Sequence, residues 1–136
     1  MNREIKFRAW LGNQKRMVKC IGILTMQKEL MCFSEDGHEI EIIDYREGTD
    51  NIQLMQYTGL KDKNGVEIYE GDIVKVHYEA CDGYIEGSTL CVVEYVDGWC
   101  RVIFQYLHDK DGNYYSVEDL DMNDVEVIGN IYKNKV

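Results

Sequence analysis

The sequence contains no proline, and none of its hydrophobic runs approaches the length that a membrane-spanning helix needs. Residues 1–8 also lack the uninterrupted apolar segment of a secretory signal peptide, because charged side chains are threaded through them. We therefore expect neither secretion nor membrane insertion. At 136 residues, with 45% hydrophobic and 29% charged residues, the chain has the composition of a folded protein of one domain or two small lobes.

The sequence also lacks any sign of a disulfide framework. Its five cysteines are odd in number and include no Cys-x-x-Cys motif, which argues against both disulfide bonds and a zinc ribbon. They are Cys20, Cys32, Cys81, Cys91 and Cys100. A reducing compartment is the natural interpretation, and we expect the protein to act in the cytoplasm.

Positive charge is scarce, and the formal net charge is −10 at pH 7. This acidity disfavours nucleic-acid binding, because such surfaces gain affinity by neutralising phosphates with Lys and Arg. The charge is uneven: residues 1–20 carry six basic side chains and one acidic side chain, so the rest of the chain carries a net −15. We interpret the basic segment as a solvated strand face or as a surface complementary to another subunit, in preference to an anion site.

Without proline, glycine-containing dipeptides punctuate the chain. Five of them supply the positive backbone angles that two-residue hairpin turns require. They are Asp36-Gly37, Asn64-Gly65, Asp82-Gly83, Asp97-Gly98 and Asp111-Gly112. Their regular spacing predicts antiparallel β structure. No long helical pattern occurs, and residues 116–119 predict at most a short helical turn.

The clearest predicted hairpin runs from residue 90 to residue 106. A two-residue turn at Asp97-Gly98 sets Glu94 opposite Arg101, an exposed cross-strand pair worth roughly 0.2–1 kcal/mol. The predicted core face of this hairpin carries Cys91, Val93, Tyr95, Cys100, Val102, Phe104 and Tyr106. We expect Cys91 and Cys100 to be small buried hydrophobic residues and not nucleophiles.

The residues before position 65 predict an N-terminal lobe built from hairpins. One hairpin joins residues 3–10 with residues 15–23, and another runs from residue 21 to residue 45 around Asp36-Gly37. We therefore place an N-terminal β lobe at residues 1–65.

The residues after position 65 predict a second lobe. The tight turn at Gly71-Asp72, and the apolar alternation that follows it, are typical of a chain entering a small barrel. The last strand, residues 125–132, is expected to close the sheet with a bulge or close approach at Gly129. The prediction is an all-β fold whose second lobe, residues 66–136, is an SH3-like barrel. The two lobes pack tightly together or form one domain.

The run from Gln56 to Val74 looks like a signature, unlike an ordinary strand or turn. It reads Gln-Tyr-Thr-Gly-Leu-Lys-Asp-Lys-Asn-Gly-Val-Glu-Ile-Tyr-Glu-Gly-Asp-Ile-Val. Together with Ile5–Trp10 and Glu126–Tyr132, it resembles the YopX family of phage and prophage proteins. The three blocks span nearly the whole chain in the right order. The chain departs from the family at Leu11, where family members often have an acidic residue after the tryptophan.

The resemblance implies an all-β protein with an SH3-like C-terminal barrel, encoded by a phage or prophage and acting inside a bacterium. It implies no reaction. A functional prediction must therefore come from the residues themselves.

No arrangement of side chains indicates catalysis or a bound cofactor. A Cys/His pair is unfavourable, because His77 and Cys81 on one strand lie about 13 Å apart. A calcium loop around Gly112 lacks its first carboxylate, since Leu107 occupies that position, so these residues predict a turn. No glycine-rich phosphate cradle is present. We predict no enzymatic activity, no cofactor and no metal ligand.

Aromatic residues offer the best indication of a binding surface. The chain has ten tyrosines and two tryptophans, and tyrosine is enriched at protein interfaces. Tyr57 and Tyr69 flank the turn that follows Lys61, and Arg8 and Trp10 lie nearby if the first strand packs against it. These five residues are candidate partner contacts. For the two tyrosines, packing at the joint between the lobes is the favoured interpretation.

The sequence thus predicts a protein-binding or adaptor module without enzymatic activity. We expect it to form homo-oligomers and to contact a host or phage protein. The alternative is a nucleic-acid-binding protein, or an acidic mimic of DNA, that acts on host machinery.

Overall fold

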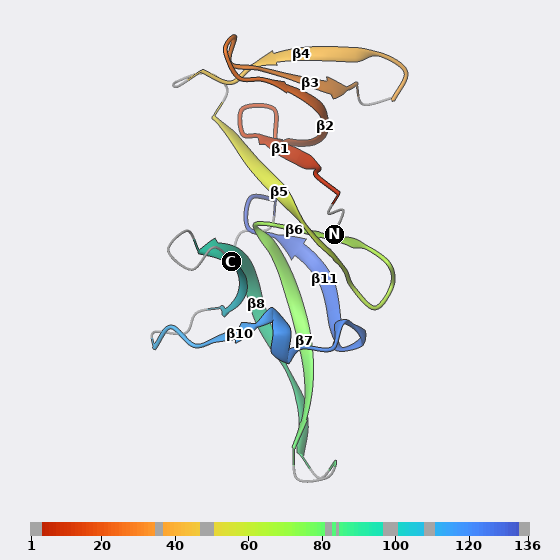
Figure 1. Cartoon of the computed structure of the whole chain (residues 1–136), viewed down its shortest axis with the longest axis vertical. Helices are drawn as coiled ribbons and strands as arrows, with labels where there is room; N and C mark the ends of the chain where they lie inside the picture. The colour runs from red at the N-terminus through yellow and green to blue at the C-terminus, as the bar shows by residue number, and fades with distance from the viewer. Residues whose placement is uncertain are drawn as a thin grey trace. The chain divides into compact units, whose positions relative to one another are not determined.

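A computed structural model of the chain describes residues 4–34, 37–46, 51–80, 83, 85–96, 101–107 and 111–133. These residues form antiparallel β-strands with short connections (Figure 1). The strands are β1 (Phe7–Leu11), β2 (Arg16–Leu24), β3 (Glu29–Phe33), β4 (Ile40–Asp44), β5 (Ile52–Lys61), β6 (Glu67–Tyr69), β7 (Asp72–Ala80), β8 (Ile85–Val96), β9 (Arg101–Tyr106), β10 (Tyr114–Ser116) and β11 (Val125–Asn130). The predicted all-β class is confirmed.

Helical structure in the described residues is limited to short turns of 3-10 helix, η2 (Val117–Asp119) and η3 (Met122–Asp124). The first falls where the sequence predicted a short helical turn. Among all the residues that the structure describes, no helix has the length and hydrophobicity that crossing a membrane requires.

The strands form two sheets. The first has the order β4-β3-β2-β1-β5-β6, and the second has the order β10-β9-β8-β7-β11. Neither sheet closes on itself within the described residues, so the SH3-like barrel stays a prediction with which the second sheet is compatible. The bulge predicted at Gly129 is confirmed, because the register of β11 against β7 shifts between Val127 and Gly129.

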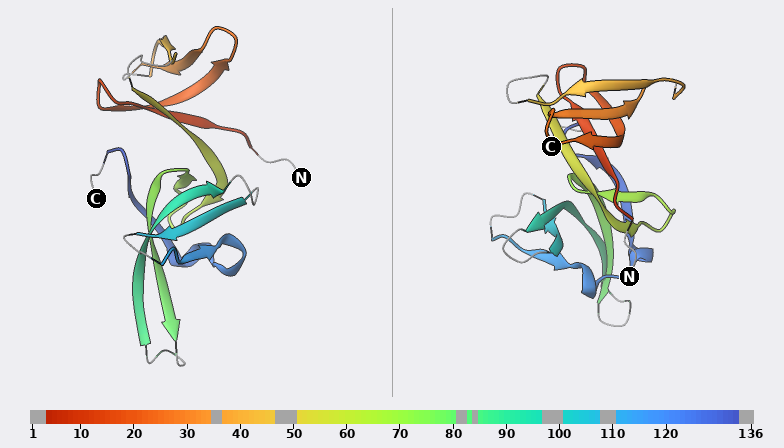
Figure 2. Two further views of the ribbon diagram at one scale, coloured as in Figure 1. Left: turned by 90° about the vertical axis from the view of Figure 1, so that its left-hand side faces the viewer. Right: turned by 45° about the horizontal axis from the view of Figure 1, so that its top comes forward.

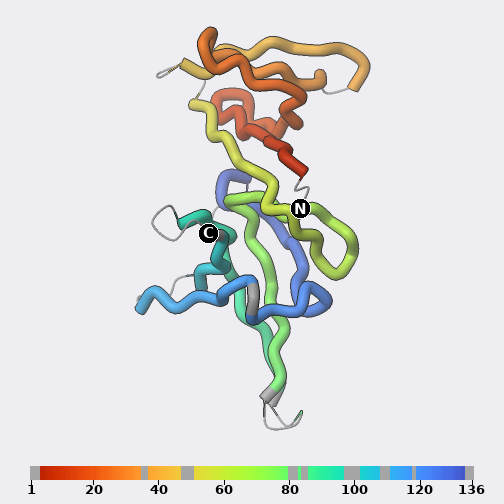
Figure 3. The backbone as a smooth tube through the Cα atoms, in the orientation of Figure 1, coloured from red at the N-terminus to blue at the C-terminus, as the bar shows by residue number. Residues whose placement is uncertain are grey.

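The chain divides into two compact units, residues 1–57 and residues 58–136. The division falls inside β5, after Tyr57, and Figure 3 shows the chain continuing through that strand. The turn chemistry of the sequence placed the boundary later, between residues 65 and 66. Residues 62 and 63 hydrogen-bond to β11, a strand of the second unit, and therefore belong to that unit.

Each unit has a core of its own. In the first unit the buried residues are Ala9, Leu11, Val18, Leu30, Cys32 and Ile43. In the second unit they are Ile68, Val74, Val76, Cys91, Val93, Phe104 and Val125. Alternate strand positions supply both sets, as expected where one face of a sheet is buried.

The predicted glycine turns lie between paired strands, but each connection is longer than the two residues predicted. Gly37, Gly65, Gly83 and Gly112 all have positive φ angles and lie between the paired strands β3–β4, β5–β6, β7–β8 and β9–β10. The predicted pairing of residues 3–10 with residues 15–23 is confirmed by β1 and β2. The hairpin predicted from residue 21 to residue 45 is shorter, because a turn at residues 25–28, where Lys28 has φ 57°, separates β2 from β3.

The predicted register of the hairpin at residues 90–106 is wrong by two residues. Glu94 lies opposite Ile103, and Arg101 lies opposite Val96. The strands are joined by residues 97–100, four residues in place of the predicted two; the Asp97-Gly98 turn itself lies outside the described residues. A two-residue shift equals the side-chain repeat of a strand, so Cys91, Val93 and Phe104 are buried as predicted. Tyr95, which was predicted on the same core face, is 46% exposed.

Candidate functional site

The loop between β5 and β6 is organised by the carboxylate of Asp62. Its Oδ1 accepts hydrogen bonds from the backbone N–H groups of Asn64 (2.8 Å) and Val66 (2.9 Å). Its Oδ2 accepts one from the N–H of Val127 in β11 (2.9 Å). Only 6% of Asp62 is exposed, so these bonds replace the water that a carboxylate requires. One side chain therefore closes the turn and ties it to the last strand.

The ionisation of Asp62 follows from this environment. Burial by itself raises the pKa of the carboxyl group, but the N–H donors of Val127, Val66 and Asn64 outweigh burial and hold the pKa below its usual range. The residue is consequently an anion at neutral pH, in a structural role. Sequence reasoning missed it, although an aspartate two residues before Asn-Gly is a common pattern for a side chain that bonds its own turn.

A second buried carboxylate shapes the turn at Gly71-Asp72. Oδ2 of Asp72, which is 1% exposed, accepts a hydrogen bond from the N–H of Tyr69 (2.8 Å). Gly71 has a φ of 84°. Its N–H donates to the carbonyl of Val93 (2.8 Å), and its own carbonyl accepts from the N–H of Ile131 (2.9 Å). The predicted tight turn is therefore held by β8 and by the end of β11.

Arg8 and Trp10 alternate with Ala9 and Leu11 in β1 and therefore lie on the face of the sheet opposite the core. Both are half-buried. The guanidinium Nη2 of Arg8 is 3.7 Å from Sδ of Met55, its partner in β5. The structure thus brings these two candidate contacts to one face of the first unit.

The candidate contacts of the signature differ in accessibility. Tyr57 is 3% exposed and Tyr69 is 6% exposed, whereas Lys61 is exposed. The Nζ atom of Lys6 lies 5.4 Å from the centre of the Tyr57 ring, within cation–π range. The Tyr69 hydroxyl donates to Oε1 of Glu67 (3.4 Å). Packing accounts for both tyrosines, so of these three residues only Lys61 presents its side chain to solvent.

Several exposed hydrophobic side chains lie together on β3 and β4, where the sequence singled out no contact. Phe33 pairs with Ile40, and Met31 pairs with Ile42, so these four side chains share one face; we call them the apolar patch. Ile40 is 56% exposed, Ile42 is 52% exposed and Phe33 is 44% exposed. The sequence could have indicated this patch, because Ile40 and Ile42 lie on one face of the short strand and Ile43 lies on the other, so both faces are hydrophobic.

β4 is also the first strand in the order of its sheet, an edge position. The strand contains no proline or lysine, and its two charged residues, Glu41 and Asp44, are already paired with Arg16 and Arg46. The apolar patch therefore coincides with a strand edge suited to pairing with another chain.

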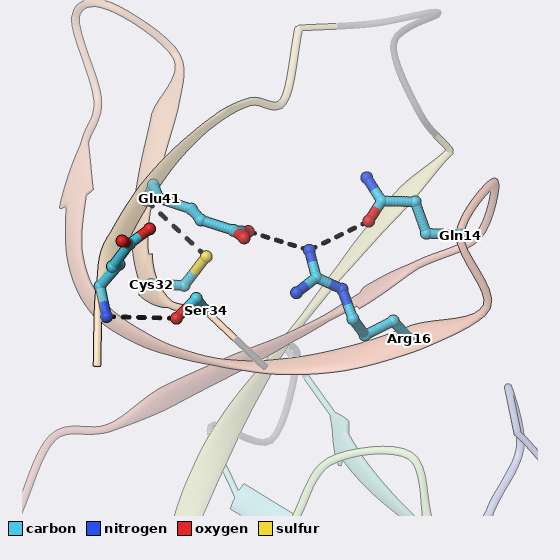
Figure 4. A network of polar contacts seen from close by, with 6 residues as sticks. Gln14, Arg16, Cys32, Ser34 and Glu41 are labelled. Carbon is cyan, nitrogen blue, oxygen red and sulfur yellow. Dashed lines mark hydrogen bonds and ion pairs between the residues drawn. The ribbon is translucent and has the colours of Figure 1, made fainter. Parts of the chain in front are cut away.

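A hollow of about 390 Å³ adjoins the patch. Its lining includes Phe33 of the patch, Ser34 after β3, and Arg16 and Lys19 of β2. Figure 4 shows that the Arg16 guanidinium is engaged by Oε2 of Glu41 (2.9 Å) and by Oε1 of Gln14 (3.0 Å). Because Arg16 is already paired, the hollow has a weaker attraction for an anion than its two cations suggest.

The cysteines that the structure describes are free, and their environments suppress reactivity. Burial raises the pKa of Cys91 to about 12. Burial, and to a lesser extent the thiol of Cys32, raises the pKa of Cys20 to about 11. These thiols are neutral at physiological pH and are not activated as nucleophiles. Cys81, and with it the predicted spacing from His77, lies outside the described residues, as does Cys100.

Comparison with known protein families matches the description "YopX protein" over residues 6–136. No curated protein matches the chain. Among solved structures, protein EF1440 from Enterococcus faecalis is similar at 28% identity and a TM-score of 0.57; the match covers 98% of this chain and 96% of that one. YopX from Bacillus subtilis is similar in fold at 23% identity and a TM-score of 0.53, with 95% and 94% of the two chains covered.

Proposed function

The chain belongs to the YopX protein family, and we propose that it acts without catalysis, as a protein-binding module that assembles with further copies of itself through the apolar patch. The similar proteins from Enterococcus and Bacillus support action within a bacterium. A phage or prophage origin, the bacterial cytoplasm and a host or phage protein as a further partner are parts of the same proposal.

The observation that carries the proposal is the apolar patch on an edge strand. An exposed hydrophobic surface beside an unblocked β edge loses contact with water, and gains backbone hydrogen bonds, when another edge pairs with it. A second copy brings an identical edge and an identical patch, which is the self-complementary geometry of a twofold dimer.

Charge favours the first unit as the contact. Residues 1–57 carry eight basic and nine acidic side chains, a net charge of −1, whereas residues 58–136 carry seven basic and sixteen acidic side chains, a net charge of −9. The first unit is nearly neutral, so a contact between two first units brings little like charge together.

Sedimentation velocity over a range of protein concentrations tests this proposal. The wild-type chain is expected to assemble as its concentration rises. Ile42→Lys places a charge at the centre of the patch and is expected to weaken assembly by about tenfold or more, as replacing a central apolar contact commonly does. Ile128→Lys is the matched control, because Ile128 of β11 is similarly exposed (49%) but lies outside the patch.

A wild-type chain that stays monomeric at every concentration would sink the proposal. So would an Ile42→Lys variant that assembles as the wild type does. Circular dichroism of each variant shows whether the fold is retained.

The acidic excess of residues 58–136 favours a second candidate function, an acidic mimic of nucleic acid. A surface of this charge repels phosphates, so it fits a DNA-binding protein of the host better than it fits DNA. The test is competition between this chain and labelled duplex DNA for a host nuclease. Displacement of the DNA that fades as salt rises supports mimicry, and an unchanged DNA complex argues against it.

A further inference from the structure

Figure 2 shows the hairpin that β7 and β8 form. On one face of this hairpin, three side chains that can ligate a metal lie close together. His77 and Glu79 lie two positions apart in β7, so both point to the same side of the strand. Glu86 of β8 lies directly opposite Glu79 in the register. All three side chains are exposed, and neither the core nor the contacts of the signature loop use them.

The distances suit a shared cation. Nε2 of His77 is 3.7 Å from Oε1 of Glu79 and 3.9 Å from Oε2 of Glu86, and the three ligand atoms all lie within 4.8 Å of one another. Zinc–nitrogen and zinc–oxygen bonds of about 2.1 Å in a tetrahedral site separate two ligand atoms by about 3.4 Å. Small rotations of exposed side chains close the difference.

Electrostatics also favours a cation between these strands. Two carboxylates that face each other across an antiparallel pair repel and weaken the pairing. Glu79 and Glu86 occupy such positions. A divalent ion held by both converts this repulsion into attraction and joins the two strands.

The donor set identifies the class of ion. Zinc accepts both imidazole nitrogen and carboxylate oxygen, and zinc sites that keep a position open have three protein ligands, the number present here, whereas calcium and magnesium take oxygen ligands. We propose that His77, Glu79 and Glu86 bind one zinc ion, with its remaining coordination position open to water. His77 also lines a hollow of about 250 Å³ with Lys75 and Asp124.

Isothermal titration of the full chain with Zn²⁺ tests the proposal. One zinc ion per chain is expected. His77→Ala and Glu86→Gln are each expected to weaken binding at least about tenfold, because loss of even an outer partner of a zinc ligand costs that much. His38→Ala, which removes another exposed histidine, in the first unit, is the matched control and should bind zinc as the wild type does.

Thermal unfolding supplies a second readout that separates the site from zinc bound elsewhere. Zinc is expected to raise the melting temperature of the wild type and of His38→Ala, but not that of His77→Ala. The proposal is overturned if the wild type binds no zinc, or if His77→Ala binds it as tightly as the wild type. Binding that instead disappears on replacement of Cys20 by serine would equally reject it, since a thiol would then be the ligand.

Discussion

At the scale of single residues, Asp62 shows how a carboxylate buried among backbone donors holds distant parts of the chain together. Its three hydrogen bonds reach Asn64 and Val66 in its own turn and Val127, sixty-five positions away. Replacing an aspartate in an exposed turn costs little stability. At Asp62, however, both carboxylate oxygens accept hydrogen bonds in a buried site, where water cannot replace them. The signature is thus partly explained as a structural device.

We predict that Asp62→Ala lowers the free energy of unfolding by roughly 3 kcal/mol, because it leaves buried N–H donors without an acceptor. Urea denaturation followed by circular dichroism measures the change. Asp119→Ala, at an exposed aspartate of η2, should alter stability by less than about 0.5 kcal/mol. Equal effects of the two variants would show that the Asp62 network does not stabilise the fold.

The depressed pKa of Asp62 predicts a dependence of stability on pH. The folded state lowers this pKa from 3.8, so the stabilisation is complete above that value and is lost as pH falls through the folded pKa. The difference in stability between the wild type and Asp62→Asn should be constant near neutral pH and should shrink in acid. Denaturation at a series of pH values measures it. A difference that grows in acid would contradict the assignment.

At the scale of elements, the hairpins follow from local backbone preference. Gly65 has a φ of 80°, and a β-carbon added there meets no atom within 4 Å. The requirement at this position is therefore conformational and not a matter of space.

We accordingly predict that Gly65→Ala destabilises the chain by about 1 kcal/mol, the usual penalty of a positive φ angle for an L-residue. Gly65→Asn should cost less, because asparagine tolerates this conformation. Thermal and urea unfolding compare the two variants. If both cost the same, the backbone argument fails and a contact of the substituted side chain must be responsible.

Strand pairing shows the limit of such local reasoning. The Asp97-Gly98 dipeptide predicted a two-residue turn, yet β8 and β9 are joined by four residues, and Glu94 faces Ile103. A shift of the pairing by two residues keeps Val93 and Phe104 in the core, so the burial of this face fits both registers and excludes only a shift by one. The alternation of apolar residues therefore predicted the face of each strand but not its exact partner residues.

At the scale of the whole molecule, net charge opposes association. Each copy carries −10, so bringing copies together costs repulsion that salt screens. We predict that self-assembly through the apolar patch strengthens as the sodium chloride concentration rises. Sedimentation velocity at low and high salt measures the dissociation constant. Assembly that weakens with salt would indicate an interface of ion pairs and would contradict a hydrophobic one.

The candidate site was only partly visible in the sequence. Tyrosine enrichment pointed to Tyr57 and Tyr69, but both are buried, and accessibility depends on how strands stack and not on residue type. The apolar patch required knowing that β4 is an edge strand. The cluster of His77, Glu79 and Glu86 required the register of β7 against β8.

By itself the sequence determined the β class, the glycine turns, the bulge at Gly129 and the alternation that builds each core, because φ preferences and the two-residue strand repeat act between neighbours in the chain. Only the tertiary structure decided the β8–β9 register, the bond from Asp62 to Val127 and the exposure of Ile42. These depend on contacts between residues far apart in the chain, whose energies exceed local preferences and leave no local pattern to read.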